Sequence, residues 1–118
     1  MFYIKNDTDQ TFAFKVLEKL DFNDIKFSVE FDLGWVKGIV ISSCPEIKIN
    51  NLLKRLIDLM QFDSKCQQIN FINDGSVDLE LSKNRTGTLI LKGSLMPDMI
   101  CDDQLEFSLE GVLNIGPN

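Results

Sequence analysis

Short runs in which apolar and polar residues alternate recur along most of the chain, and they constrain the fold more than any other feature. The clearest run is Ile25–Leu33, where five apolar residues alternate with charged residues and one serine. A period of two places every second side chain on one face of a β-strand, so this run predicts a strand with one buried and one solvent-facing side. Similar patterns predict further strands at Thr11–Leu17, Trp35–Ser42, Gln67–Ile72, Val77–Leu81, Thr88–Leu95 and Leu105–Leu109.

One segment has helical spacing instead. Asn51 to Gln61 or Phe62 predicts an α-helix, with Asn50 as the N-cap residue, because an asparagine side chain can accept from the first free backbone N–H groups. The residues that recur at helical spacing form one apolar stripe: Ile49, Leu52, Leu53, Leu56, Leu59 and Met60.

Turn residues separate the predicted strands. Asn73-Asp74-Gly75 is a strong hairpin signal, and Asn84–Gly87 turns the chain again. Strands joined by short turns pair antiparallel. The sequence therefore predicts an α+β fold, a mostly antiparallel β-sheet arranged as a meander or an open sandwich, with one central helix packed on it. No linker interrupts the pattern, so we expect residues 1–118 to form a single domain.

The chain contains no histidine. This excludes Ser-His-Asp and Cys-His nucleophile systems and zinc sites that use histidine. The cysteines Cys44, Cys66 and Cys101 are widely spaced and are expected to be reduced thiols, although the sequence leaves a Cys44–Cys66 disulfide open.

Two pairs of carboxylates are candidates for acid/base groups. Asp78 and Glu80 lie two residues apart on one predicted strand, and Glu106 and Glu110 lie four apart on another. All four are expected to face water, whereas acid/base catalysis needs a desolvated carboxyl with a raised pKa. Phosphate-cradling glycine loops and calcium-loop spacing are also missing from the sequence. We therefore expect no enzymatic activity, no cofactor and no metal.

Negative charge is concentrated near the C-terminus. Residues 93–118 hold five acids and no Lys or Arg, while residues 1–92 hold 13 acids and 12 bases. A field of one sign attracts a basic partner and repels nucleic acid. The segment Met96–Asp103 adds apolar side chains beside the acids. The predicted partner-binding residues are Asp98, Met99, Ile100, Asp102, Asp103, Glu106 and Glu110. Two alternatives stay open, namely that the acids only keep the chain soluble and that Met99 and Ile100 pack into the core.

No apolar run is long enough to span a membrane, and the N-terminus does not have the pattern of a secretory signal. We expect a cytoplasmic protein that binds neither membrane nor nucleic acid directly.

The order of the predicted elements resembles that of the WapI-like immunity proteins of bacterial polymorphic and contact-dependent toxin systems. The resemblance covers about residues 24–110. It rests on the paired strands of Ile25–Ser42, the approach Pro45-Glu46-Ile47, the helix Asn51–Leu59, the later strands at residues 77–81 and 87–95, and the closing strand Leu105–Leu109. Many members end that strand with an Asp-Gln-Thr-Tyr-Leu-like segment, where this chain reads Glu110-Gly111-Val112-Leu113.

The resemblance implies a cytosolic immunity protein that binds and neutralises a cognate toxin domain. The acidic C-terminal part of this chain predicts in addition that the toxin is basic, for example a nuclease, and that it binds an acidic surface of this protein. The alternative is a small-ligand- or lipid-binding β domain without catalytic activity, whose cavity would be lined by phenylalanines.

Overall fold

The computed structural model describes residues 1–61, 68–84, 86–96 and 105–116. The helical elements are a short 3-10 turn, η1 (Asp21–Asn23), and the α-helix α1 (Glu46–Leu59). The strands are β1 (Phe2–Lys5), β2 (Thr11–Lys19), β3 (Asp24–Asp32), β4 (Lys37–Pro45), β5 (Gln68–Asn73), β6 (Val77–Lys83), β7 (Leu89–Leu95) and β8 (Leu105–Ile115). The predicted α+β class with a mostly antiparallel sheet is confirmed.

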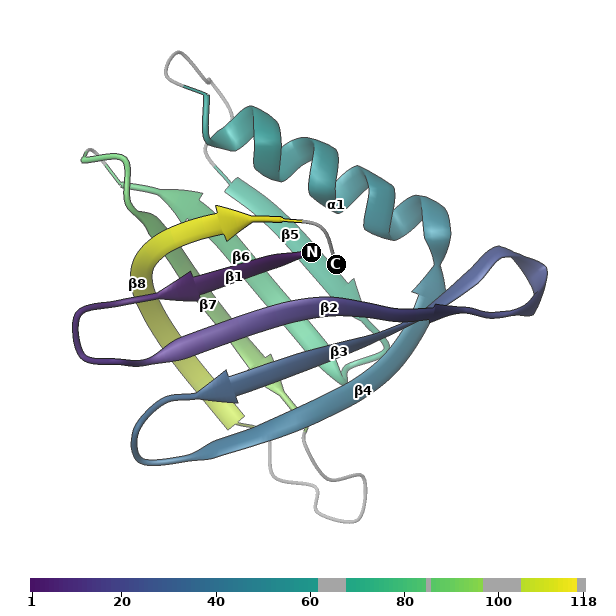
Figure 1. The fold of residues 1–118 in the computed structure, drawn as a ribbon, viewed down its shortest axis with the longest axis horizontal. Coiled ribbons are helices and arrows are strands. Elements are labelled where there is room, and N and C mark those ends of the chain that lie inside the picture. The colour runs from purple at the N-terminus through teal and green to yellow at the C-terminus, as the bar shows by residue number, and fades with distance from the viewer. Residues whose placement is uncertain (62–67, 85, 97–104, 117–118) are drawn as a thin grey trace.

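The strands form one antiparallel sheet in the order β4-β3-β2-β1-β8-β7-β6-β5. Two meanders, β1–β4 and β5–β8, are therefore joined where the first strand pairs with the last. β8 is shared between them, because its first part pairs with β7 and its last part pairs with β1. The two ends of the described chain consequently lie together, and the N–H of Gly116 donates to the carbonyl of Met1 at 3.1 Å (Figure 1).

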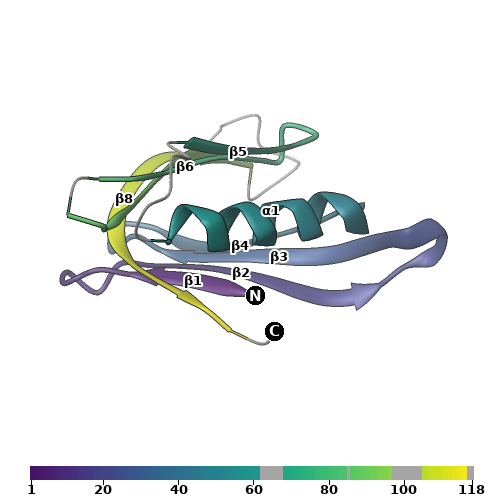
Figure 2. The same cartoon turned by 90° about the horizontal axis from the view of Figure 1, so that it is seen from above.

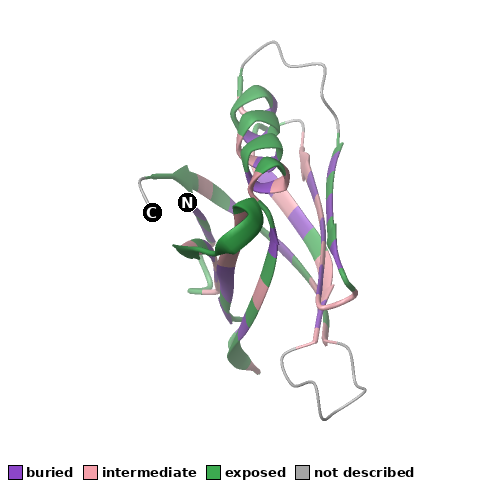
Figure 3. Cartoon of the chain, turned by 90° about the vertical axis from the view of Figure 1, so that its right-hand side faces the viewer, coloured by how far each residue is buried: buried purple, intermediate pink, exposed green. Residues whose placement is uncertain are grey.

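The sheet folds over on itself along β8. Figure 2 shows β5 and β6 in one layer, β1 to β4 in the other, and β8 curving between them. Buried and exposed residues alternate along the strands of both layers (Figure 3), as a period of two requires. This arrangement corresponds to the open sandwich that the alternation allowed.

The core lies between the layers and is rich in phenylalanine. Phe14 and Phe27 stack with ring centroids 4.8 Å apart, and both meet Phe71 of the opposite layer edge-on, at 5.5 and 5.8 Å. Phe12 stacks on Phe107 at 5.8 Å. Such aromatic contacts add to the burial of large apolar area, so they hold the two layers together.

The helix joins the two edge strands, β4 and β5, and covers the gap between them (Figure 2). Of the predicted apolar stripe, Ile49, Leu52, Leu56 and Leu59 are buried, while Leu53 and Met60 are partly buried against the core. The stripe was therefore predicted correctly, and Leu53 and Met60 are the two members that are less deeply buried than the others.

The predicted start of the helix was wrong. α1 begins at Glu46, and Pro45 rather than Asn50 occupies the N-cap position. Pro45 ends β4 because it has no N–H for a ladder, and no glycine or proline between residues 46 and 50 opposes helix growth from that point. Glu46 in the first turn is also favourable beside the helix dipole.

Several strand predictions were too short or missing. β1 was not predicted, β2 continues to Lys19, β4 spans Lys37–Pro45 instead of Trp35–Ser42, and β8 continues to Ile115. The hairpin at residues 73–75 is confirmed, because Asp74 and Gly75 both have positive φ, at 52° and 73°.

Candidate functional site

The outer face of the β5–β8 layer, turned away from the core, carries a group of polar and acidic side chains. Its side chains lie in three rows that run across the strands. The rows are Ile72-Asp78-Ser94-Glu106, Asn70-Glu80-Lys92-Ser108 and Gln68-Ser82-Ile90-Glu110. We call the carboxylates Asp78, Glu80, Glu106 and Glu110 on this surface the acidic face.

The acidic face has four carboxylates and one cation. Asp78 and Glu80 come from β6, Glu106 and Glu110 from β8, and Lys92 lies directly opposite Glu80 on β7. Asp78 and Glu106 are two strands apart, which is about 10 Å. Fields at that distance still overlap at ordinary salt, so the carboxylates act together on a charged partner. None of the ion pairs found among the described residues involves them.

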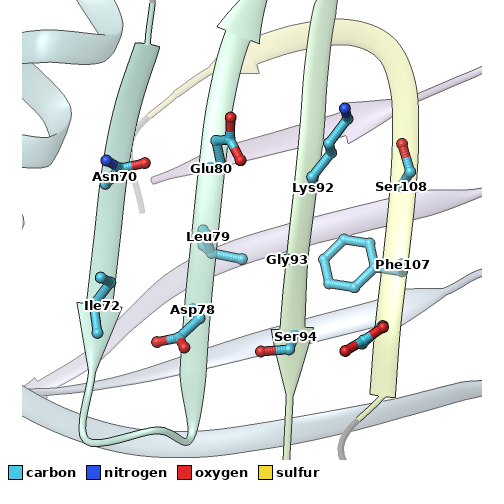
Figure 4. A pocket seen from close by; sticks show the side chains of 11 residues that line it. Asn70, Ile72, Asp78, Leu79, Glu80, Lys92, Gly93, Ser94, Phe107 and Ser108 are labelled. Atoms are coloured by element: carbon cyan, nitrogen blue, oxygen red, sulfur yellow. The ribbon is translucent and has the colours of Figure 1, made fainter.

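An open depression of about 420 Å³ lies in this face. Four strands contribute to it, and Figure 4 shows Asp78 and Glu80 on β6 beside Lys92 and Ser94 on β7. At its centre Gly93 allows β7 to approach the backbone of Asp78, where a Cβ would collide with the carbonyl oxygen of Asp78. The hollow is therefore a consequence of strand packing.

Asp78 is the acid with the most unusual surroundings. Its Oδ1 atom is buried, yet it has no hydrogen-bond partner in the described part of the chain. Buried polar atoms are normally paired, because an unpaired one loses its hydration without compensation. A cationic or N–H donor placed in the depression would supply that partner. Glu110, in contrast, accepts a hydrogen bond from the side-chain amide of Asn84.

The structure places two of the predicted partner-binding residues on this face. Glu106 and Glu110 are both exposed on the outer side of β8, as the alternation indicated. Asp98, Met99, Ile100, Asp102 and Asp103 lie outside the described residues, so their part in a common surface stays a prediction.

The sequence did not reveal that the two carboxylate pairs share one surface. The sequence indicated Asp78 and Glu80 only as possible acid/base groups, and it did not indicate Lys92, Ser94 or Asn70 as site residues. The signal was present in the register of two hairpins, because Asp78 pairs with Ser94 and Ser94 with Glu106. The register of β7 with β8 follows a connection whose length does not determine how the two strands pair. The sequence alone therefore could not show that Ser94 lies beside Glu106.

Within the described ranges, no group of three Cys, Asp or Glu side chains comes together as a metal site requires. Cys44 is a buried free thiol, and burial raises its pKa. Nearby Lys48 opposes that rise, while Asp24 and Asp74 add to it. Because Cys44 is free, the Cys44–Cys66 disulfide that the sequence left open is not formed in this structure, and Cys66 and Cys101 themselves lie outside the described residues.

No known protein family, curated protein or solved structure matches this chain significantly. No helix of the described part is long and apolar enough to cross a membrane. The class that the structure itself defines is an α+β protein, a folded eight-stranded antiparallel sheet with one helix and an acidic outer face.

Proposed function

We propose that this protein is a cytoplasmic immunity protein, which binds a basic toxin domain through the acidic face and has no catalytic activity of its own. The observation that carries the proposal is the meeting of four carboxylates from β6 and β8 on one sheet face with Lys92 as the one cation among them. The likeness of the predicted element order to WapI-like immunity proteins supports the same function. A nuclease is the expected kind of toxin, because its substrate cleft must attract phosphate.

Electrostatics gives this face a specific role. Complementary charge raises the rate at which two proteins meet, and it favours a basic partner over others. Asp78 then adds a short-range contact when its side chain turns outward, because its buried Oδ1 lacks a hydrogen-bond partner here and an arginine or lysine of the toxin can donate one. An inhibitor of this kind blocks a basic substrate cleft by occupying it.

The packing of the core favours this proposal over a small-ligand or lipid carrier. A carrier of that kind would need phenylalanines around a cavity. Here Phe14, Phe27 and Phe71 fill the interior by stacking on one another, with ring centroids 4.8 to 5.8 Å apart. The outer faces of the sheet are therefore better suited to binding a partner than the filled interior is.

The proposal is tested with candidate toxin domains taken from the genes neighbouring the one for this protein, by co-purification and then by stopped-flow association at several salt concentrations. The test variant carries Asp78→Asn, Glu80→Gln, Glu106→Gln and Glu110→Gln. The control carries Asp9→Asn, Glu18→Gln, Asp21→Asn and Asp58→Asn, which remove the same total charge from exposed positions elsewhere.

We expect the association rate of the test variant to fall by about an order of magnitude or more and to lose most of its salt dependence. The control should retain most of the rate of the unmodified protein, because a distant charge is screened within about 10 Å at 0.1 M salt. Equal rates for the two variants would contradict a role for the acidic face. Failure of the unmodified protein to bind the toxin domain would contradict the immunity function itself.

A further inference from the structure

The two edges of the sheet are covered to different extents. At the β5 edge, α1 supplies cations to the outward carbonyls, with Lys48 donating to Ile72 and Arg55 donating to Gln68 at 3.3 Å. Natural proteins protect edge strands in this way because unpaired backbone groups can capture another strand. At the β4 edge, the side-chain amide of Asn73 donates to the carbonyl of Ser43 at 3.0 Å. That protection covers only the end of β4 next to the helix.

Two hydrogen bonds show which way the rest of the β4 backbone points. Asn73 reaches the carbonyl of Ser43 from the side away from β3, so Ser43 points outward. The N–H of Leu33 donates to the carbonyl of Val36 across the β3–β4 turn, so Val36 points toward β3. Because orientation alternates along an antiparallel strand without a bulge, Lys37, Ile39 and Ile41 direct both N–H and C=O to the edge. No strand of the described chain pairs with that edge.

Two of the three outward side chains at this open edge, Ile39 and Ile41, are apolar, and the third is Lys37. Ile39 and Ile41 are 46% and 54% exposed on the outer face of β4. A groove of about 660 Å³ follows the edge, with residues 39–42 on one side and Asp74, Ser76 and Met96 on the other. Its volume lies within the range of about 300–1,000 Å³ that is typical of ligand sites. β-Branched side chains, free backbone groups and a groove together suit an added β-strand.

We propose that the open edge of β4, residues 37–41, binds an extended segment of a partner protein as an additional β-strand. Three outward residues offer three N–H and three C=O groups, so main-chain hydrogen bonds supply much of the affinity. Apolar side chains at alternate positions of the segment would pack beside Ile39 and Ile41. The inference is independent of the acidic face, which lies on the other layer of the sheet.

Charge selects the kind of segment. Asp74 lines the groove, and Asp32 lies beside Lys37 in the register of β3 and β4. A lysine or arginine next to the apolar positions of the segment complements Asp74, whereas Lys37 of the edge itself already offsets the charge of Asp32. A second copy of this chain would instead bring the same acids and a net charge of −6 to the interface, so like charges oppose self-pairing.

The test uses a short acetylated peptide in which valine alternates with lysine and threonine. Amide hydrogen exchange of the full chain is followed by NMR with and without the peptide at about 1 mM, a concentration that detects even weak complexes. We expect exchange at Ile39 and Ile41 to slow about tenfold, because their N–H groups gain a partner. Val40 should change little, because its N–H already faces β3. A peptide methylated at the backbone nitrogens that face the edge should not protect either residue.

Two single substitutions test whether the peptide binds at the β4 edge. Ile41→Lys should weaken peptide binding about tenfold or more by placing positive charge at the edge. The matched control is Ile72→Lys, which changes an isoleucine that is 61% exposed on β5. The variant that neutralises the acidic face should bind the peptide as the unmodified protein does, so this test fails or succeeds separately from the proposed function.

Three results would overturn the inference. The first is that exchange at Ile39 and Ile41 is unchanged by the peptide. The second is that Ile41→Lys and Ile72→Lys bind the peptide equally well. The third is that the protein is a dimer at micromolar concentration by light scattering and that Ile41→Lys makes it a monomer, which would assign the edge to a second copy.

Discussion

At the scale of single residues, Asn73 connects the two layers of the sheet. Its side chain is only 4% exposed, and its amide donates to Ser42 Oγ at 2.8 Å and to the carbonyl of Ser43 at 3.0 Å. Ser76 Oγ lies 3.2 Å from the same Ser42 hydroxyl. Asn73 ends β5 and Ser42 belongs to β4, so this small polar cluster joins the edge strands of the two meanders.

We predict that Asn73→Ala lowers the free energy of unfolding by about 1–3 kcal/mol, because the buried amide makes two hydrogen bonds, to Ser42 Oγ and to the carbonyl of Ser43, and both are lost. Urea denaturation followed by circular dichroism measures the change. The control is Asn70→Ala on the exposed side of the same strand, which should stay within about 0.5 kcal/mol of the unmodified protein. A similar loss for both variants would show that the strand, rather than the buried amide, determines the effect.

At the scale of elements, α1 is stabilised by its buried side more than by its ends. Its N-cap position makes no side-chain hydrogen bond. Leu56 and Leu59 are fully buried, whereas Ile57 between them is 47% exposed. The helix therefore depends on packing against the sheet, as most short amphipathic helices do.

We predict that Leu56→Ala costs about 2–5 kcal/mol of unfolding free energy, since a buried leucine that is truncated leaves a cavity. Ile57→Ala removes a comparable side chain from the exposed side of the same turn. It should cost about 0.5 kcal/mol or less. Equilibrium urea unfolding of both variants checks the difference. Equal costs would mean that the buried stripe of the helix contributes nothing specific.

At the scale of the whole molecule, the pairing of β1 with β8 turns two meanders into one sheet. Gly111 lies where β8 passes from β7 to β1, and an added Cβ there would come within 2.5 Å of the carbonyl oxygen of Lys5. The close approach of the two strands thus requires a residue without a side chain.

We predict that Gly111→Ala destabilises the protein by about 1–3 kcal/mol or more, because the strands must separate to admit the new methyl group. Gly116→Ala is the matched control, since a Cβ at that position meets no atom within 4 Å. Thermal unfolding of the two variants compares them directly. Unchanged stability in Gly111→Ala would show that β1 and β8 adjust without cost.

The sequence by itself determined the local features of this protein. Alternation at Ile25–Leu33 predicted which apolar residues of β3 face the core, but it was wrong for Ser28, which was expected to face water and is fully buried. The 73–75 turn predicted one hairpin, and the apolar stripe predicted the buried side of α1. These features depend on side chains near each other in the chain, so their patterns can be read directly. The same alternation indicated that Glu106 and Glu110 share a face.

Only the tertiary structure decided how these parts meet. It paired the first strand with the last, brought Asp78 and Glu80 onto the same face as Glu106, and left residues 37–41 of β4 without a partner strand among the described residues. A period of two fixes the face on which a side chain lies but not which strand becomes its neighbour. The neighbour is selected by burial of the whole core and by close approaches such as that at Gly111. For this reason the acidic face and the β4 edge became visible only in the folded chain.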